Sequence, residues 1–181
     1  MDFNNTSIDD RRARGFTLVE LMVAMAVAAL LMMVVGTLAL YSGRSFAALA
    51  NYTDLDHASR NALDTLTRDV RQTQKLSSFQ TNELVFVDSD GQPLTYRYSA
   101  ADGTFRRIKG GTSQVLLTEC DYLKFSIYQR NPIGGTYDQY DAATADTCKL
   151  IEVSWICSRQ IFGKKVNTES VQTAKIVIRK Q

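Results

Sequence analysis

The sequence contains a single histidine, two prolines and three cysteines, and this scarcity argues against several classes of site. The cysteines form no Cys-x-x-Cys pair and have no histidine near them in the sequence, so a zinc site is not expected. Neither a Gly-x-Gly-x-x-Gly fingerprint nor a Gly-Lys-Ser phosphate loop is present, so no nucleotide cofactor is expected. The formal net charge of +2 is too small to argue for nucleic acid as a partner.

The lone histidine, His57, also restricts enzymatic chemistry. A histidine-based triad would have to be assembled around it from distant residues, and no nucleophile motif is present. His57 stands beside Asp56 on the polar side of an expected helix, where a solvated side chain is expected. We therefore expect no enzymatic activity; an anchored hydrolase has only scattered serines, aspartates and His57 in its favour.

Charge is missing from a long stretch near the N-terminus, between Leu21 and Gly43. A helix of about 20 apolar residues crosses a hydrocarbon core of about 30 Å, so this stretch is long enough to span a membrane. Arg11, Arg12 and Arg14 precede it, and the positive-inside rule then places the N-terminus in the cytoplasm. The rest of the chain is expected outside the cytoplasm, beyond a single membrane pass.

Two ordinary membrane segments compete for this stretch. A cleaved secretory signal has an apolar region of only about 7–15 residues, which is shorter than the run seen here. A plain signal anchor fits both the length and the orientation, but it does not explain Glu20 at the head of the run. A carboxylate costs about 2.5–3.5 kcal/mol at mid-bilayer and less near the interface, so such a residue usually marks a function.

The residues around Glu20 carry a resemblance to a known family. The segment Gly15-Phe16-Thr17-Leu18-Val19-Glu20 resembles the processing motif of type IV prepilins and of type II secretion pseudopilins. The resemblance implies that a membrane aspartyl prepilin peptidase removes residues 1–15 as a leader, cutting between Gly15 and Phe16. It also implies N-methylation of Phe16 and makes Glu20 the fifth residue of the mature chain.

The resemblance gives Glu20 a role in assembly. Cleavage removes the leader arginines and creates a positive amine on Phe16. Two unit charges 4 Å apart attract by about 4 kcal/mol at an effective dielectric of about 20. In the family the amine belongs to a neighbouring subunit, so the partners implied are the prepilin peptidase, other pilin or pseudopilin subunits and the inner membrane. The assembled filament is expected in the periplasm or at the cell surface.

The remainder of the chain predicts an α+β fold. Residues 16–43 are expected to form the transmembrane and filament-core helix, and residues 44–76 continue it as an amphipathic helix with apolar residues at steps of three or four. Asp64 and Arg68 are expected to pair at i,i+4 on its polar face. From residue 77 to 181 the apolar period becomes two, with Gly and Asp turns, which predicts an antiparallel β-sheet head packed on the helix.

Part of the helix suggests a subtype. Residues 60–71 are similar to the helix segment of J-type minor pseudopilins and related minor pilins, and residues 115–117 and 123–125 resemble their mid-domain strands. The expected function is therefore that of a minor subunit in a type II secretion pseudopilus or a type IV pilus. The alternative is a single-pass, membrane-anchored binding module outside the cytoplasm.

The three cysteines permit one disulfide and one free thiol outside the cytoplasm. Cys148 is expected to pair with Cys157 or Cys120, and the alternative is three small apolar core residues with no bridge. The connectivity does not follow from the sequence.

The loop from residue 131 to 147 is the longest irregular stretch. It contains three carboxylates, which could offer oxygen ligands to calcium, although their spacing matches no defined calcium loop. A solvated loop is the alternative, and no metal site is predicted beyond this calcium candidate, formed by Asp138, Asp141 and Asp146.

Overall fold

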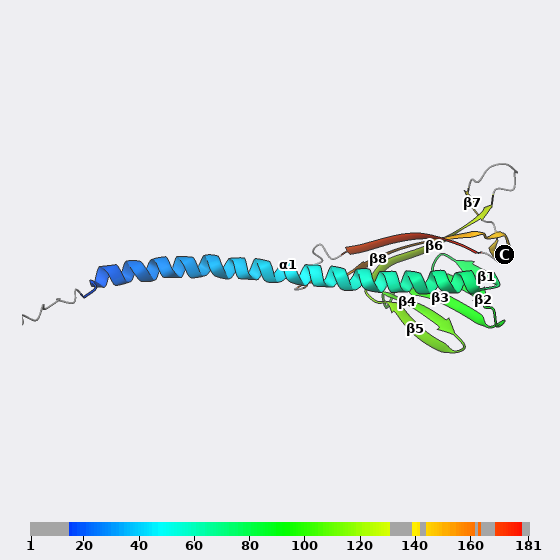
Figure 1. The fold of residues 1–181 in the computed structure, drawn as a ribbon, viewed down its shortest axis with the longest axis horizontal. Coiled ribbons are helices and arrows are strands. Elements are labelled where there is room, and N and C mark those ends of the chain that lie inside the picture. Colours follow the sequence, from blue (N-terminus) through cyan, green and yellow to red (C-terminus); the bar gives the residue numbers. More distant parts are fainter. Residues whose placement is uncertain (1–14, 131–138, 142–143, 162, 164–168, 179–181) are drawn as a thin grey trace, which may run out of the picture. The chain divides into compact units, whose positions relative to one another are not determined.

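The computed structural model describes residues 15–130, 139–141, 144–161, 163 and 169–178. Helix α1 runs from Leu18 to Gln72. Strands and a short 3-10 helix follow it in this order: β1 (Lys75–Gln80), β2 (Glu83–Val87), β3 (Pro93–Ser99), β4 (Thr104–Lys109), β5 (Thr112–Leu117), β6 (Cys120–Arg130), β7 (Gln139–Asp141), η1 (Ala145–Thr147), β8 (Leu150–Ser158) and β9 (Glu169–Val177). Figure 1 shows them coloured along the chain.

The chain divides into two compact units, one ending at Gly43 and one beginning at Arg44. In the first unit, α1 is built from alanine, leucine, methionine and valine, without proline, and most of these residues favour helix. The helix continues through Gly36 and Gly43 without a break. Within the described residues, α1 is the helix that is long and apolar enough to cross a membrane.

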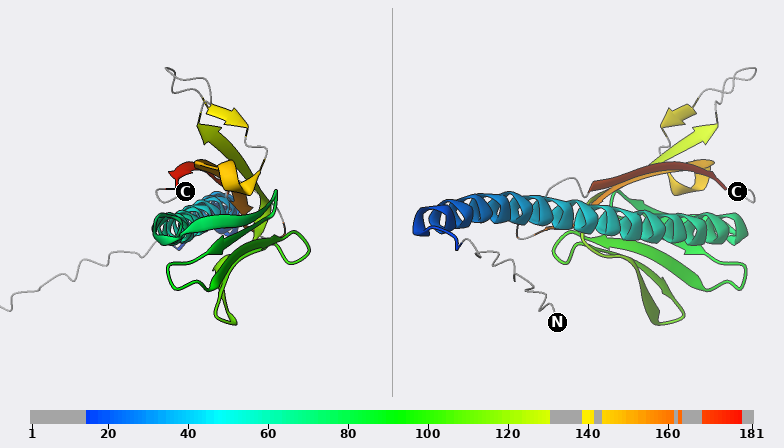
Figure 2. Two further views of the ribbon diagram at one scale, coloured as in Figure 1. Left: turned by 90° about the vertical axis from the view of Figure 1, so that its right-hand side faces the viewer. Right: turned by 60° about the vertical axis from the view of Figure 1, so that its left-hand side comes forward.

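The second unit contains the end of α1 and two antiparallel sheets. Sheet A is a meander with the order β1-β2-β3-β4-β5, and sheet B has the order β7-β6-β8-β9. The C-terminal part of α1 runs along both sheets, with sheet A on one side and sheet B on the other (Figure 1, Figure 2). Gly103 has a φ of +58° in the turn before β4, a backbone conformation that favours glycine.

Aromatic side chains join the two sheets in one core. The ring of Phe105 in sheet A lies 6.0 Å from that of Phe125 and 6.2 Å from that of Trp155, both in sheet B. All three are fully buried. The helix adds a face spaced at three and four residues: Leu55, Ala62, Leu66 and Val70.

Two buried polar contacts fix the helix against the sheets. The carboxylate of Asp69 accepts hydrogen bonds from the Tyr96 hydroxyl at 2.6 Å and from Arg107 Nε at 2.5 Å, both in sheet A. Trp155 Nε1 in sheet B donates to Ser59 Oγ at 3.2 Å. Since hydrogen bonds require specific atoms at short distances, these contacts set the register of the helix along both sheets.

The predicted fold class, a long N-terminal helix followed by antiparallel β-structure, is confirmed. The prediction that the helix ends near Leu76 was wrong by about one turn, because α1 ends at Gln72. Thr73 Oγ1 donates to the carbonyl of Val70 at 2.8 Å, and Gln74 N–H donates to the β2 carbonyl of Val87 at 2.8 Å. The chain therefore leaves the helix there and pairs as β1.

Three further details differ from expectation. The strands form two sheets rather than one, and strands β1 and β7 were not predicted. Asp64 and Arg68 do not form an ion pair in the described helix. The corresponding i,i+4 contact is made about two turns earlier, between Asp56 and Arg60 at 2.8 Å.

Candidate processing and assembly site

The first turn of α1 holds the Glu20 carboxylate through Thr17. Thr17 precedes the first helical residue, and both its backbone N–H and its hydroxyl donate to Glu20 Oε2 at 2.9 Å. In return, the backbone N–H of Glu20 donates to Thr17 Oγ1 at 3.2 Å. This reciprocal arrangement is a capping box, in which the cap residue and the third helical residue satisfy donors that the helix leaves open.

The capping box places the charge at a fixed point. Both bonds from Thr17 fall on Oε2, and Oε1 has no hydrogen-bond partner among the described residues. Gly15 and Phe16 precede the cap in non-helical, exposed backbone, and the Phe16 side chain is 87% exposed. Thr17 was not singled out from the sequence, although its Thr-x-x-Glu spacing before an apolar run is the known signature of a capping box.

Beyond Glu20, the helix presents an apolar surface on all sides. Between residues 18 and 41 its large apolar side chains are each at least 51% exposed, and nothing in the described chain covers them. Such a surface needs lipid or other protein around it, because contiguous exposed apolar area of this size is rare on soluble monomers. The residues are Leu18, Val19, Leu21, Met22, Val23, Met25, Val27, Leu30, Leu31, Met32, Met33, Val34, Val35, Leu38, Leu40 and Tyr41.

Cys148 is separated from the other two cysteines by the length of β8. Cys120 and Cys157 are directly opposite one another in the β6–β8 pairing. Cys148 lies before β8, at the opposite end of the strand, next to Lys149, whose N–H donates to the Tyr128 carbonyl. All three cysteines are buried, free thiols. The structure therefore places Cys148 away from both of the partners predicted for it, and brings Cys157 close to Cys120 instead.

The calcium candidate lies largely outside the described part of the chain. Asp138 is not among the described residues, and the backbone of Asp141 belongs to β7. Asp146 is exposed in η1. Within the described ranges, no group of three or more His, Cys, Asp or Glu side chains is placed to hold a metal ion. Calcium binding by this loop stays a prediction.

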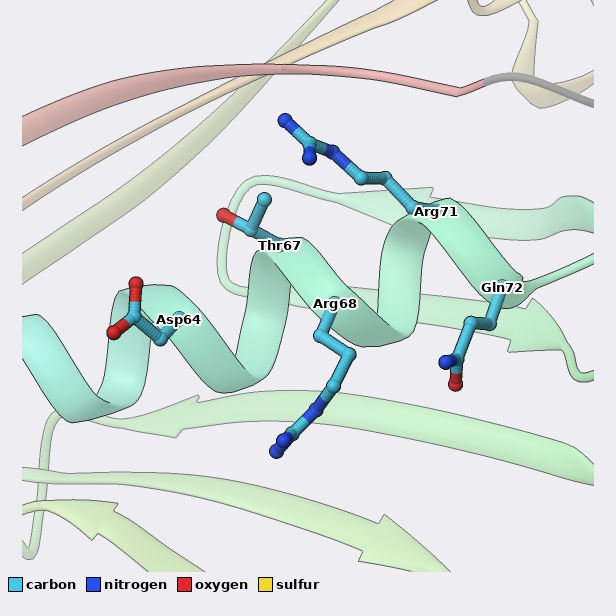
Figure 3. Close-up of a pocket in the computed structure, with 5 residues that line it drawn as sticks. All are labelled: Asp64, Thr67, Arg68, Arg71 and Gln72. Atoms are coloured by element: carbon cyan, nitrogen blue, oxygen red, sulfur yellow. The ribbon is translucent and has the colours of Figure 1, made fainter.

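The polar side chains of α1 do not form a cluster of catalytic groups. His57 is exposed. A shallow groove further along the helix is lined by Asp64, Thr67, Arg68, Arg71 and Gln72, and Figure 3 shows the two arginines extending to opposite sides of the helix. Because these side chains do not converge on one point, the groove offers no defined ligand geometry.

Comparison with known proteins agrees with the geometry at the helix start. Residues 10–36 match the family model described as the prokaryotic N-terminal methylation motif. This range includes Arg11, Arg12 and Arg14, the residues Gly15 and Phe16, the capping box and much of the apolar helix. No curated protein matches the chain. The chain therefore carries the N-terminal methylation motif that is characteristic of type IV pilins and pseudopilins, a motif of structural subunits.

Proposed function

We propose that this chain is a minor pilin or pseudopilin subunit, cleaved after Gly15, N-methylated on Phe16 and assembled into a type II secretion pseudopilus or a type IV pilus. One observation carries the proposal: a carboxylate stands at the start of an uncovered apolar helix, inside the methylation motif. The apolar helix anchors the subunit in the inner membrane before assembly and packs in the filament core afterwards. The β-sheet head then lies outside the cytoplasm.

The charge of Glu20 supports assembly through an external cation. No other charged residue occurs between Phe16 and Gly43, so this part of the helix offers Glu20 no counter-ion. The donors that it has, from Thr17, are neutral. A Phe16 amine of a neighbouring subunit can approach Oε1 while Oε2 stays bonded to Thr17. At about 4 Å that pair attracts by about 4 kcal/mol at an effective dielectric of about 20.

The exposed backbone at the predicted cleavage position supports processing. Among the described residues, nothing beyond the chain neighbours of Gly15 lies within 4 Å of the position where its Cβ would be, and the Phe16 side chain is exposed. A peptidase therefore reaches the bond between them without unfolding the helix, which begins only at Leu18. The minor-subunit assignment rests on the likeness of residues 60–71 to minor pseudopilins.

Mass spectrometry of the N-terminus of the purified protein tests processing. We expect the mature chain to begin at N-methylated Phe16. Retention of residues 1–15 would contradict the proposal and leave a single-pass anchored binding module as the function.

Glu20→Gln tests assembly separately from insertion. Glutamine keeps an oxygen that can accept the Thr17 bonds but removes the charge. We expect this variant to enter the membrane and to be cleaved, yet to be depleted at least tenfold from the sheared filament fraction. Ser45→Ala, an uncharged change beyond the apolar segment, is the matched control and should be incorporated as wild type. Normal incorporation of Glu20→Gln would refute the charge-pairing mechanism.

A further inference from the structure

The opposed cysteines of sheet B have the geometry of a cross-strand bridge. Antiparallel partners directly opposite one another project to the same face, and both Cys120 and Cys157 project into the core, 2% and 0% exposed. In this position the two thiols are in contact with each other.

The backbone hydrogen bonds identify the type of pair. Ser158 N–H donates to the Glu119 carbonyl at 3.0 Å, which makes Glu119 and Ser158 a hydrogen-bonded pair. The adjacent pair, Cys120 and Cys157, is then a non-hydrogen-bonded pair, in which Cα atoms lie about 4.5 Å apart. The Cys120 N–H bonds instead to the carbonyl of Gly103 at 2.9 Å. Disulfides join Cα atoms about 4.4–6.8 Å apart, so this pair is within bridging range.

The third cysteine is out of reach. Strands rise about 3.3 Å per residue, so the seven steps of β8 from Leu150 to Cys157 span about 23 Å. Cys148 precedes Leu150 at the far end, well beyond the bridging range of either Cys120 or Cys157.

We propose that Cys120 and Cys157 form a disulfide in the mature protein, and that Cys148 stays a thiol. The proposal rests on the extracytoplasmic head of the proposed function, because disulfides persist in the periplasm and at the cell surface. The bridge joins the start of β6 to the end of β8 and so ties together the two central strands of sheet B.

The oxidant required is a thiol–disulfide oxidoreductase in its disulfide form. The Cys120 thiolate attacks one sulfur of that disulfide, and the other sulfur leaves as a thiolate. Cys157 then gives up its proton and attacks Cys120 Sγ, which releases the second thiolate of the oxidoreductase. The head loses two thiol protons and two electrons, and the oxidoreductase is reduced to a dithiol. Since both sulfurs are buried in the folded head, the exchange takes place after β6 and β8 pair but before the rest of the core covers the two thiols.

The order of attack follows from the contact between the two thiols. A hydrogen bond from Cys157 lowers the pKa of the Cys120 thiol, and the same contact together with burial raises the pKa of Cys157. Cys120 therefore ionises first, and the thiolate is the attacking species.

Thiol counting on the full chain tests the bridge. Cells are quenched in acid, and the denatured protein is alkylated with N-ethylmaleimide before and after reduction. Trypsin then places the three cysteines on separate peptides, residues 110–124, 131–149 and 150–159. We expect one label before reduction, on Cys148, three labels after it, and a linked pair of the first and third peptides. Cys148→Ser should give no label before reduction, and Cys157→Ser two.

Three labels before reduction, or a link to peptide 131–149, would overturn the proposed bridge. The N-terminal peptide of the same digest reports on processing independently. A methylated Phe16 terminus with three free thiols defeats the bridge alone, whereas a retained leader defeats the proposed function whatever the thiol count.

Discussion

Replacing Asp69 should destabilise the β-sheet head more than any change on the polar face of α1. Asp69 is 8% exposed, and its Oδ2 accepts from both the fully buried Tyr96 hydroxyl and Arg107 Nε. Asp69→Ala removes the acceptor and leaves both donors without it. Removing one partner of a buried ion pair costs about 3–5 kcal/mol, because the remaining charge stays desolvated. Arg107 is 22% exposed at its side chain, so we expect the lower half of that range.

Tyr96→Phe separates the two bonds made by Asp69. The ion pair with Arg107 remains, and only a hydrogen bond to a charged group is lost, worth about 1.5–3 kcal/mol. The phenol also has a raised pKa, owing to burial and to the bond to Asp69, so it is neutral and a donor at ordinary pH. In the double variant the two losses should not add, because each removes the same Tyr96–Asp69 bond.

Tryptophan fluorescence during denaturation of the full chain in detergent measures these losses. Trp155 is the single tryptophan, it is fully buried in sheet B, and it contacts Phe105 of sheet A. Its emission therefore reports the packing of the head. Asp64→Ala, an exposed aspartate on the same helix, is the control and should change the free energy of unfolding by less than about 0.5 kcal/mol. An Asp69→Ala variant as stable as this control would refute the reasoning.

Three further predictions concern other contacts. Thr17→Val breaks the capping box and should lower filament incorporation several-fold without loss of membrane insertion. Thr17→Ser keeps the hydroxyl and should keep filament incorporation at the wild-type level. Equal incorporation of both variants would contradict a positioning role for Thr17. The bond from Lys109 lowers the pKa of Asp88, so the stability it confers is present above the unfolded pKa of about 3.9 and is lost as pH falls through the lower folded value. Asp88→Asn should therefore make the free energy of unfolding fall less steeply below about pH 4. An unchanged pH dependence in this range would argue against a stabilising bond between Asp88 and Lys109. A bridge between Cys120 and Cys157 closes a loop of about 38 residues and should raise the free energy of unfolding by about 4 kcal/mol over the reduced chain, measured with and without reductant.

Much of the architecture follows from local sequence patterns. The uncharged run and the recurrence of apolar residues such as Leu55, Leu66 and Val70 predicted the helix, because burial of one helical face repeats every three or four residues. The end of the helix did not follow, since the apolar residue Leu76 was assigned to the helix although its backbone pairs with Phe86 of β2. A local sequence pattern does not show that a segment will form strand hydrogen bonds with another strand instead of continuing the helix.

The other features that were not predicted, the division into two sheets and the cysteine partner, depend on pairing between strands distant in the sequence. Period-two apolar patterns identify strands but do not show which strands share hydrogen bonds, so the division into two sheets was not predictable. The cysteine partner depends on the β6–β8 register, which also shifts between Cys120 and Tyr122. The role of Thr17, by contrast, was readable from its spacing to Glu20 and was overlooked.

Asp69 and Glu20 have different surroundings on α1, which supports a folding role for Asp69 and the proposed assembly role for Glu20. Asp69 has a cation, Arg107, within its own chain, so its charge is neutralised when the head folds. Glu20 has neutral donors from Thr17 on one oxygen and no counter-ion in the described part of its helix. A carboxylate that lies next to hydrocarbon without a counter-ion is stabilised in any state that brings a cation to it. In the proposed function, removal of residues 1–15 creates such a cation on every subunit, at the start of an apolar helix that lipid or other protein must cover.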